Sequence, residues 1–273
     1  MAASKSAAIS LAIAMMCFGT SAWSATDKVP PDLSAVLSGS NEAAKDSRAT
    51  QDIPEIRLRA MTKAALEYGV QSGLARRNYE IVSMLNEQKQ MLDEIYNFSA
   101  MLLDKNVMPP VLSQSQNSIN QSDPDTIRIA DATYKIERQA HFITVPATWR
   151  DYLTIKDFKF EIDMPADVLL PKTDAEKKLW QKLIADGWKV GIQQADQIFQ
   201  KSLSLLERDY KGMVLYRSLL AKGMIGRPYV AEANLGITGD GNGMSINDRI
   251  LRITSKPQLE VNSAVWKPIV VPK

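Results

Sequence analysis

The stretch from Thr173 to Gly223 keeps one helical repeat throughout and predicts a single very long helix. Thr173 and Glu176 have the spacing of a capping box at its start, and Asp174 adds negative charge to the first turn. Lys222 followed by Gly223 provides a stop, because glycine readily adopts the left-handed conformation that ends helices. Apolar or small residues recur along one stripe, namely Trp180, Leu183, Ile184, Gly187, Trp188, Gly191, Ile192, Ala195, Ile198, Phe199, Leu203, Leu206, Tyr210, Met213 and Val214. We expect a core helix in a helical layer, with a docking surface for another chain as the alternative.

Composition excludes several classes of function for the 273-residue chain. Its net charge of +2 demands neither a nucleic acid partner nor an acidic substrate. It has no P-loop and no dinucleotide fingerprint. His141 is the only histidine and Cys17 the only cysteine, so zinc sites and histidine-activated nucleophiles lack the residues that they need. We therefore expect no enzyme activity, cofactor, metal site or nucleic acid partner.

The N-terminus predicts export. Lys5 precedes an apolar run from Ala7 to Phe18, and Ala22-Trp23-Ser24 fits signal peptidase, with cleavage after Ser24. The run is too short to span a bilayer comfortably. We interpret residues 1–24 as a signal peptide and expect the mature protein to work in the periplasm.

Cys17 offers an alternative end to this signal. Ala14-Met15-Met16-Cys17 is similar to a lipobox, whose cysteine is acylated and becomes the first residue of a lipoprotein. Lipidation at Cys17 is therefore a second possibility, although Met16 stands where a small residue is expected. With cleavage after Ser24, the mature chain has no cysteine and so no disulfide in an oxidising compartment.

The next segments predict a tether followed by helices. Residues 25–54 are rich in proline, serine and charge, lack aromatic residues, and are expected to be a flexible tether. A helical pattern starts at Pro54, and Gly69 with Gly73 indicates a bend or a close backbone approach within it. A second long helix is predicted from Leu74 to Leu102.

A change of period then predicts strands. The serine-, glutamine- and asparagine-rich segment Ser113–Asp125 is expected to be an exposed loop. Alternation over Thr126–Glu137 predicts a hairpin that turns at Ala130-Asp131, and His141–Val145 is a third strand candidate. Residues 156–172 read as a loop that leads into the long helix.

The C-terminal part predicts a second hairpin. Tyr229–Ile237 and Ile246–Thr254 flank the glycine-rich turn Thr238–Gly243. Leu259–Val261 is a candidate short strand, and Trp266–Pro272 suits an edge strand or the extension of a partner's sheet. Residues 55–273 are thus expected to form one α+β domain, with long amphipathic helices packed with short antiparallel β-hairpins.

Few residues are candidates for chemistry. Asp240 and Asn242 resemble part of a calcium loop, but Met244 and Leu251 stand where an EF-hand needs oxygen donors, which favours a structural turn. His141 has no partner histidine or cysteine. Two pairs of acids have the close spacing of glycosidase carboxylates, but neither shows a reason for a raised pKa; they are Asp123 with Asp125 and Glu161 with Asp163.

Candidate partner contacts lie in two aromatic segments. Trp149, Arg150 and Tyr152 combine residue types that dominate interaction hot spots, although a local packing cluster is the favoured alternative. The C-terminal segment adds Trp266, Pro268 and Ile269.

A further set of short segments is distinctive in combination: Tyr68-Gly69, Ser72–Ala75, Asn97-Phe98, Pro109–Leu112, Ile127-Arg128, Ala130-Asp131, Tyr134–Glu137, Thr148–Leu153, Arg208–Tyr210, Thr238–Gly241, Asn247–Arg249, Leu251–Ile253 and Trp266–Pro268. Together these segments resemble the DotC family of type IVB secretion systems, and its conjugal-transfer branch most closely. The resemblance extends over roughly residues 55–270.

The resemblance implies a structural subunit of the outer-membrane core complex. Members of the family are outer-membrane lipoproteins that act with a small lipoprotein, DotD, to bring the secretin-like subunit DotH to the outer membrane, and they form rings of many copies. It transfers no catalytic residues. The alternatives from the residues themselves are a periplasmic enzyme that acts on peptidoglycan and a transient periplasmic assembly chaperone.

Overall fold

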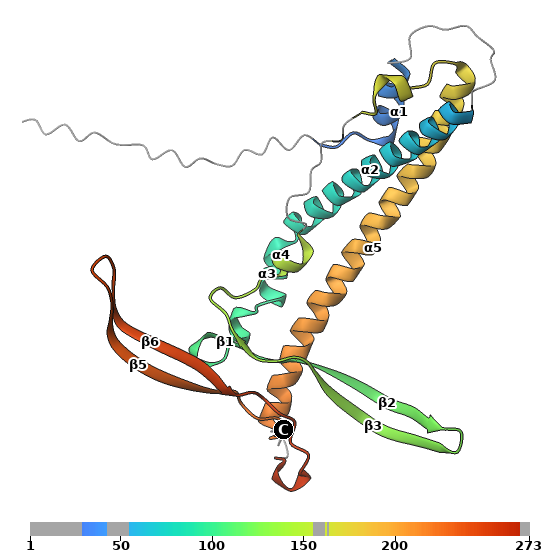
Figure 1. Cartoon of the computed structure of the whole chain (residues 1–273). Coiled ribbons are helices and arrows are strands. Elements are labelled where there is room, and N and C mark those ends of the chain that lie inside the picture. The colour runs from blue at the N-terminus through green and yellow to red at the C-terminus, as the bar shows by residue number, and fades with distance from the viewer. Residues whose placement is uncertain (1–28, 43–54, 155–161, 163, 268–273) are drawn as a thin grey trace, which may run out of the picture.

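The computed structural model describes residues 29–42, 55–154, 162 and 164–267. The molecule is elongated (Figure 1): two long helices lie together over much of its length, and two β-hairpins extend in different directions from one end of the longer helix. Helices and separate antiparallel two-stranded sheets make an α+β fold, as the sequence predicts.

The predicted long helix is confirmed as α5, Asp174–Ala221, with 48 residues. At 1.5 Å per residue it is about 70 Å long. Its capping box is present: the backbone N–H of Glu176 donates to the Thr173 hydroxyl, and the Glu176 carboxylate accepts from the Thr173 N–H. Gly223 follows the helix at φ 69°. Three clusters of buried apolar residues lie along this one helix, so the core is extended.

Helix α2, Glu55–Glu87, runs parallel to α5. Arg57 near the start of α2 pairs with Glu176 near the start of α5, and Arg77 pairs with Asp196 further along both helices. A parallel pair needs a long return connection, and the segment between the two helices provides it. The second predicted helix is corrected, because its first part continues α2 and only α3, Lys89–Ile95, is separate.

Glycines bring the two helices into backbone contact. A Cβ on Gly69 would lie 2.5 Å from the Ile184 carbonyl oxygen, and one on Gly187 would lie 2.6 Å from that of Leu66. Gly73 and Gly191 approach the partner helix just as closely, at less than 3.0 Å. Of the two sequence interpretations of Gly69 and Gly73, close approach is the one observed; α2 stays helical through both.

The tether prediction for residues 25–54 is wrong over part of its range, because Leu33–Glu42 forms helix α1. The Asp32 carboxylate accepts from the Ala35 N–H and so supplies an end for this helix. Val36 is buried against the core cluster that includes Trp180 and Ile184. Leu33 and Leu37 are partly buried against the same cluster, so three apolar side chains and a cap dock the segment.

The first β region differs most from expectation. β2, Val111–Asp123, pairs along its length with β3, Thr126–Arg138. The predicted exposed loop Ser113–Asp125 is therefore mostly strand, and the chain turns between Asp123 and Thr126, not at Ala130-Asp131. The polar strand shows no alternation because neither face of the hairpin is buried over most of its length.

The remaining elements are short or agree with prediction. The second hairpin is confirmed as β5, Tyr229–Gly239, and β6, Met244–Ser255. The strand His141–Val145 is reduced to β4, His141–Phe142, which pairs with β1, Val107–Met108, and Leu259 forms only an isolated bridge with Ile225. Also present are α4, Trp149–Leu153, and four 3-10 turns: η1, Ser99–Met101; η2, Asp104–Asn106; η3, Asp167–Leu169; and η4, Ser263–Val265. The predicted loop 156–172 is described only in part.

Within the described residues, no helix has the length and apolar character that crossing a membrane requires.

Candidate partner-binding surfaces

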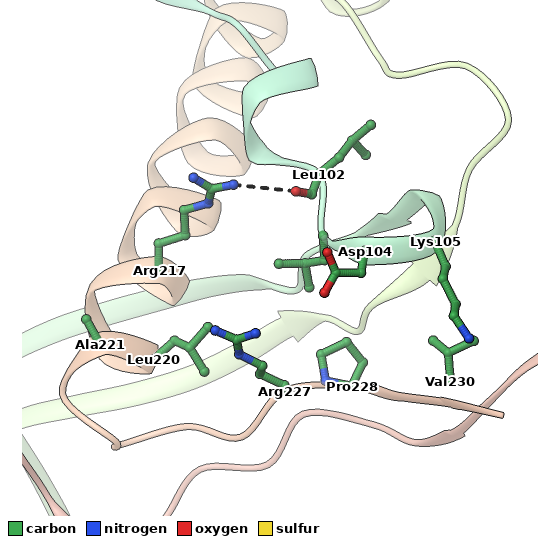
Figure 2. A pocket seen from close by; sticks show the side chains of 10 residues that line it. Leu102, Asp104, Lys105, Arg217, Leu220, Ala221, Arg227, Pro228 and Val230 are labelled. Carbon is green, nitrogen blue, oxygen red and sulfur yellow. Dashed lines mark hydrogen bonds between the residues drawn. The ribbon is translucent and has the colours of Figure 1, made fainter.

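A groove of about 540 Å³ lies where β5 leaves the body of the molecule (Figure 2). Three segments form it: the chain through η2, the end of α5, and the start of β5. Its walls combine apolar and charged side chains; the lining residues are Leu102, Leu103, Asp104, Lys105, Arg217, Leu220, Ala221, Arg227, Pro228 and Val230.

The groove carries surplus positive charge. Arg217 donates to the carbonyl oxygens of Ala100 at 2.6 Å and Leu102 at 3.5 Å, both neutral groups that leave its charge uncompensated (Figure 2). The exposed Arg227 has no hydrogen-bond or ion-pair partner within the described residues. Asp104 is the one acid in the lining, against two arginines and Lys105, and Lys105 is paired with Glu232. A ligand with carboxylates beside apolar groups would match this lining.

Ion pairs hold the β5–β6 hairpin next to the groove. Lys105 Nζ lies 2.8 Å from the Glu232 carboxylate of β5, and Arg249 of β6 lies 3.2 Å from the same group. The hydrogen bond from Lys105 is the main cause of the lowered pKa of Glu232. Lys105 itself has a φ of 59°, a left-handed conformation that turns the chain beside the groove.

The distal part of the β2–β3 hairpin exposes an apolar cluster beside an acidic turn. Ile119 and Ile129 are directly paired, Ile127 lies two residues from Ile129 on the same strand, and the three are 68%, 72% and 58% exposed. At the turn, Asp123 accepts from the Asp125 N–H, and both side chains are exposed. Because the three isoleucines are grouped and have a polar rim, this part of the hairpin is a candidate contact surface.

The β5–β6 hairpin has a comparable apolar cluster near its own turn. Ile237 pairs with Ile246, Met244 lies two residues before Ile246, and all three are about two-thirds exposed, at 68%, 65% and 67%. Each hairpin thus presents apolar side chains away from the core.

Charge and proline, two of the features that usually protect an open strand edge, are absent from most of β2. From Val111 to Ser122 the strand contains no charged residue and no proline. Edge strands generally carry such residues because a bare edge invites pairing with another chain. β5 is similar, with Glu232 as its only charge.

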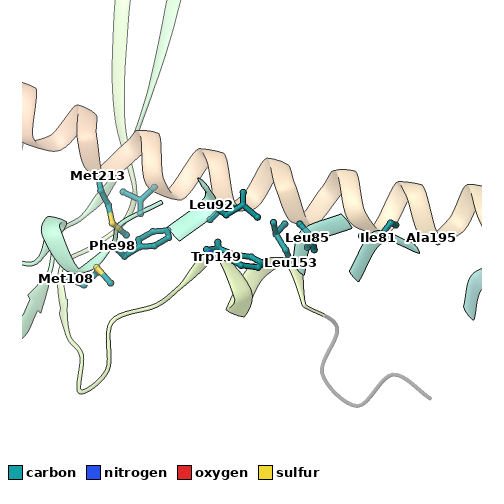
Figure 3. Packing of buried hydrophobic residues seen from close by; sticks show 11 residues of the cluster. Ile81, Leu85, Leu92, Phe98, Met108, Trp149, Leu153, Ala195 and Met213 are labelled. Carbon is teal, nitrogen blue, oxygen red and sulfur yellow. The ribbon is translucent and has the colours of Figure 1, made fainter. Parts of the chain in front are cut away.

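The predicted contact residue Trp149 lies within the core, as its packing alternative describes (Figure 3). Its indole N–H donates to Asp93 at 2.7 Å. Arg150 pairs with the same carboxylate through two nitrogens and lies 4.3 Å from the centre of the Trp149 ring. This Arg150 hydrogen bond is the main cause of the lowered pKa of Asp93. The side chain of Trp149 therefore offers no surface here, whereas Arg150 stays 46% exposed.

The side chain of Tyr152 also packs inside the molecule. Its ring stacks on Phe98, and its hydroxyl donates to the buried carboxylate of Asp209 at 2.9 Å. Arg138 at the end of β3 and Arg208 pair with the same carboxylate. Burial is the main cause of the raised pKa of Tyr152. These contacts tie the base of the β2–β3 hairpin to α4 and α5.

The other predicted contact residues are partly outside the described chain. Trp266 is 41% exposed, and its indole N–H donates to the Glu260 carbonyl oxygen. Cys17, Pro268 and Ile269 lie outside the described residues, as does the whole predicted signal peptide.

Among the candidates for chemistry, Asp240 has a structural role. The Asp240 carboxylate accepts from the N–H groups of Asn242 and Gly243, which closes the β5–β6 turn and lowers the pKa of Asp240. His141 is exposed. Glu161 and Asp163 lie outside the described residues. Over the ranges that the structure covers, no three histidine, cysteine or acidic side chains are grouped as metal ligands.

Sequence reasoning missed the groove and the β2 edge. Lys105, Arg217 and Arg227 come from distant segments, and no local pattern connects them. The β2 edge did leave a signal: the uncharged segment 113–122 has about the length of the alternating segment that follows it, as the two arms of a hairpin do.

Comparison with known proteins identifies the family. Residues 55–268 match the T4SS_TraI family, described as "Type IV secretory system, conjugal DNA-protein transfer". The chain belongs to this family. As a T4SS_TraI member it is a component of a conjugal type IV secretion system, so the expectation of type IV secretion and conjugation is confirmed. No curated protein matches the chain.

Proposed function

We propose that this T4SS_TraI member is a non-enzymatic structural subunit of the outer-membrane core complex of a type IVB conjugation machine. In this proposal it acts as a DotC-type protein that, with a DotD-like lipoprotein, places and holds the DotH-like secretin subunit in a ring of many copies. The resemblance over residues 55–270 supports the DotC-type role.

The two hairpins are the observation that carries the proposal. A two-stranded hairpin alone in water is marginal, because it has no face to bury. Here both hairpins extend from the body, carry exposed isoleucines and leave strand edges open (Figure 1). Such elements gain stability when another chain covers them, which is the property of an assembly subunit.

The predicted signal peptide supports a periplasmic location in this proposal. Attachment to the outer membrane would come either from an acyl group on Cys17 or from partner subunits alone. The two routes differ in the mass of the mature protein.

The test is intact mass, membrane fractionation and co-purification of the tagged full-length protein from cells with the complete transfer system. Wild type and Cys17→Ser are compared. We expect the wild type in the outer-membrane fraction together with the DotH-like and DotD-like subunits. Acylation predicts a lipid mass on Cys17 and release of the variant, whereas a mass that starts at Ala25 in both predicts retention through proteins.

Other outcomes would contradict the proposal. Release of soluble muropeptides by the purified protein, lost on Asp163→Asn or Asp240→Asn substitution, would indicate an enzyme that acts on peptidoglycan. Association with the DotH-like subunit before assembly but absence from the finished complex would indicate a chaperone.

A further inference from the structure

We propose that the groove beside β5 receives the tip of the β2–β3 hairpin from a second copy of this chain, so that copies join head to tail. The inference rests on the proposed role as a subunit present in many copies. It names the contact through which neighbouring copies recognise one another.

Charge complementarity points to this occupant. The tip presents Asp123 and Asp125, both exposed and without an ion-pair partner within the described residues. The groove presents the unpaired Arg227 together with Arg217, whose hydrogen bonds are to neutral carbonyl groups. Each surface thus holds charge that the other would neutralise, and complementary charge of this kind selects partners and orientation.

Apolar groups match beside the charges. Ile119, Ile127 and Ile129 lie next to the acidic turn of the hairpin and are more than half exposed. The groove places Leu103, Leu220 and Val230 beside its arginines. Docking would remove both sets from water, which is favourable in proportion to the apolar area buried.

The directions of the hairpins fit a head-to-tail contact. In Figure 1 the β2–β3 and β5–β6 hairpins leave the same end of α5 toward opposite sides. A neighbour in the same orientation therefore extends its β5–β6 hairpin toward the β2–β3 hairpin of the first copy. The two edges are the least charged of the four hairpin strands and have similar lengths, 13 and 11 residues.

Such a contact joins two different surfaces. Because tip and groove are distinct patches, the interface is heterologous, and each copy retains a free tip and a free groove. Repetition of a heterologous contact gives a ring when the rotation closes.

Disulfide cross-linking tests this contact in cells with the complete transfer system. One tagged chain carries Pro124→Cys, which lies between the two tip acids and leaves both carboxylates in place, and a differently tagged chain carries Pro228→Cys at the groove. We expect a cross-linked dimer with both tags when the chains are expressed together. A single chain with both substitutions should give a ladder of multimers, because the contact repeats.

Controls make each result decisive. Each single-cysteine chain and the wild type, which contains Cys17, are oxidised alone to give the background. Thr238→Cys with Ser245→Cys, a directly paired position in β5–β6, shows that periplasmic thiols oxidise. Dimers of the Pro124→Cys chain alone, which would mean tip-to-tip contact, or no mixed dimer despite the working control, would overturn the inference. Co-purification with the core complex in that case would leave the proposed function standing.

Charge reversal gives an independent test. Arg227→Glu and Asp125→Arg should each reduce transfer frequency about tenfold or more, since like charges then meet across the contact. The two changes together should restore transfer to near the wild-type frequency. Lys201→Glu, an exposed reversal on α5, is the matched control and should have no effect. Failure of the double variant to recover would overturn the pairing of these two residues.

Discussion

At the scale of the residue, Glu176 connects helix formation to helix packing. It is buried, accepts from the N–H groups of Lys172 and Thr173 at the start of α5, and pairs with Arg57 of α2 through both carboxylate oxygens. The Arg57 hydrogen bond is the main cause of its lowered pKa. One side chain therefore fixes where α5 begins and which helix lies beside it.

Removal of Arg57, which pairs with the buried Glu176, should lower the free energy of unfolding more than removal of an arginine in an exposed pair. Arg57→Ala leaves the buried carboxylate with only its capping bonds, and we expect the free energy of unfolding to fall by about 3 kcal/mol, at the low end for breaking a buried pair. Urea denaturation measures this value. Arg59→Ala, which breaks an exposed pair with Glu55, is the control and should change it by less than about 1 kcal/mol. Equal losses in the two variants would show that the buried pair contributes no more to stability than the exposed pair.

Acid should weaken the same contact. Because the pKa of Glu176 is lowered in the folded protein, its carboxylate contributes stability that is fully present above the ordinary value of 4.5 and is lost as the pH falls through the lowered value. Below pH 4.5, stability should therefore fall more steeply in the wild type than in Glu176→Gln. Thermal unfolding across this range checks it, with the exposed Glu67→Gln as a variant that should follow the wild type.

At the scale of the element, small residues set the distance between α2 and α5. Gly69 and Gly73 face Gly187 and Gly191, and their missing side chains let backbone meet backbone. Glycine lowers helix propensity by about 1 kcal/mol relative to alanine, so four glycines weaken these helices as isolated segments. The contact itself offsets that cost, because each helix packs against main-chain atoms.

Alanine at this contact should destabilise the protein despite its better helix propensity. The new Cβ in Gly187→Ala would lie 2.6 Å from the Leu66 oxygen, which forces the helices apart. We expect a loss of about 1–3 kcal/mol, as for other overpacked cores. Gly226→Ala is the matched control, since its Cβ would first meet an atom at 4.0 Å. Calorimetry should show a lower Tm only for Gly187→Ala; an unchanged Tm there would mean that the helices separate without cost.

At the scale of the whole molecule, the residues that stabilise the fold and the surfaces offered to partners lie in different parts. The buried clusters lie along α5, whereas the distal parts of both hairpins contribute nothing to them. Only the base of the β2–β3 hairpin joins the core, through Val111, Leu112, Tyr134 and Ile136. The fold thus holds two long contact elements on a body that does not depend on their tips.

Shortening one hairpin should separate the two properties. Replacement of Gln116–Ala132 by Asn-Gly joins the paired residues Ser115 and Thr133 through a two-residue turn. We expect the Tm to change by only a few degrees, because no buried residue is removed, while conjugal transfer is lost. Plasmid mating and thermal unfolding measure the two effects. Normal transfer by the shortened, folded protein would show that the tip has no role in assembly.

The sequence predicted those elements whose pattern comes from local forces. The capping box at Thr173 fixed the start of α5, Gly223 fixed its end, and the glycine-rich turn 238–243 fixed the second hairpin. The β2–β3 hairpin was predicted only in part. Alternation of apolar and polar residues arises when one face of a strand is buried, and most of this hairpin has no buried face. Residues 33–42 were misassigned because only three apolar side chains, Leu33, Val36 and Leu37, dock them, too few to stand out in a segment rich in polar residues.

The sequence by itself determined the long helix α5, the α+β class and the poor inventory for catalysis, because propensity, capping and composition are properties of nearby residues. Only the tertiary structure decided that Gly69 and Gly73 form a contact, that Trp149 packs inside, and that Arg217 and Arg227 share a groove with Lys105. Each of these depends on which distant segments meet. Which segments meet is decided by packing between distant parts of the chain, such as the parallel contact of α2 with α5, and no local pattern records such contacts.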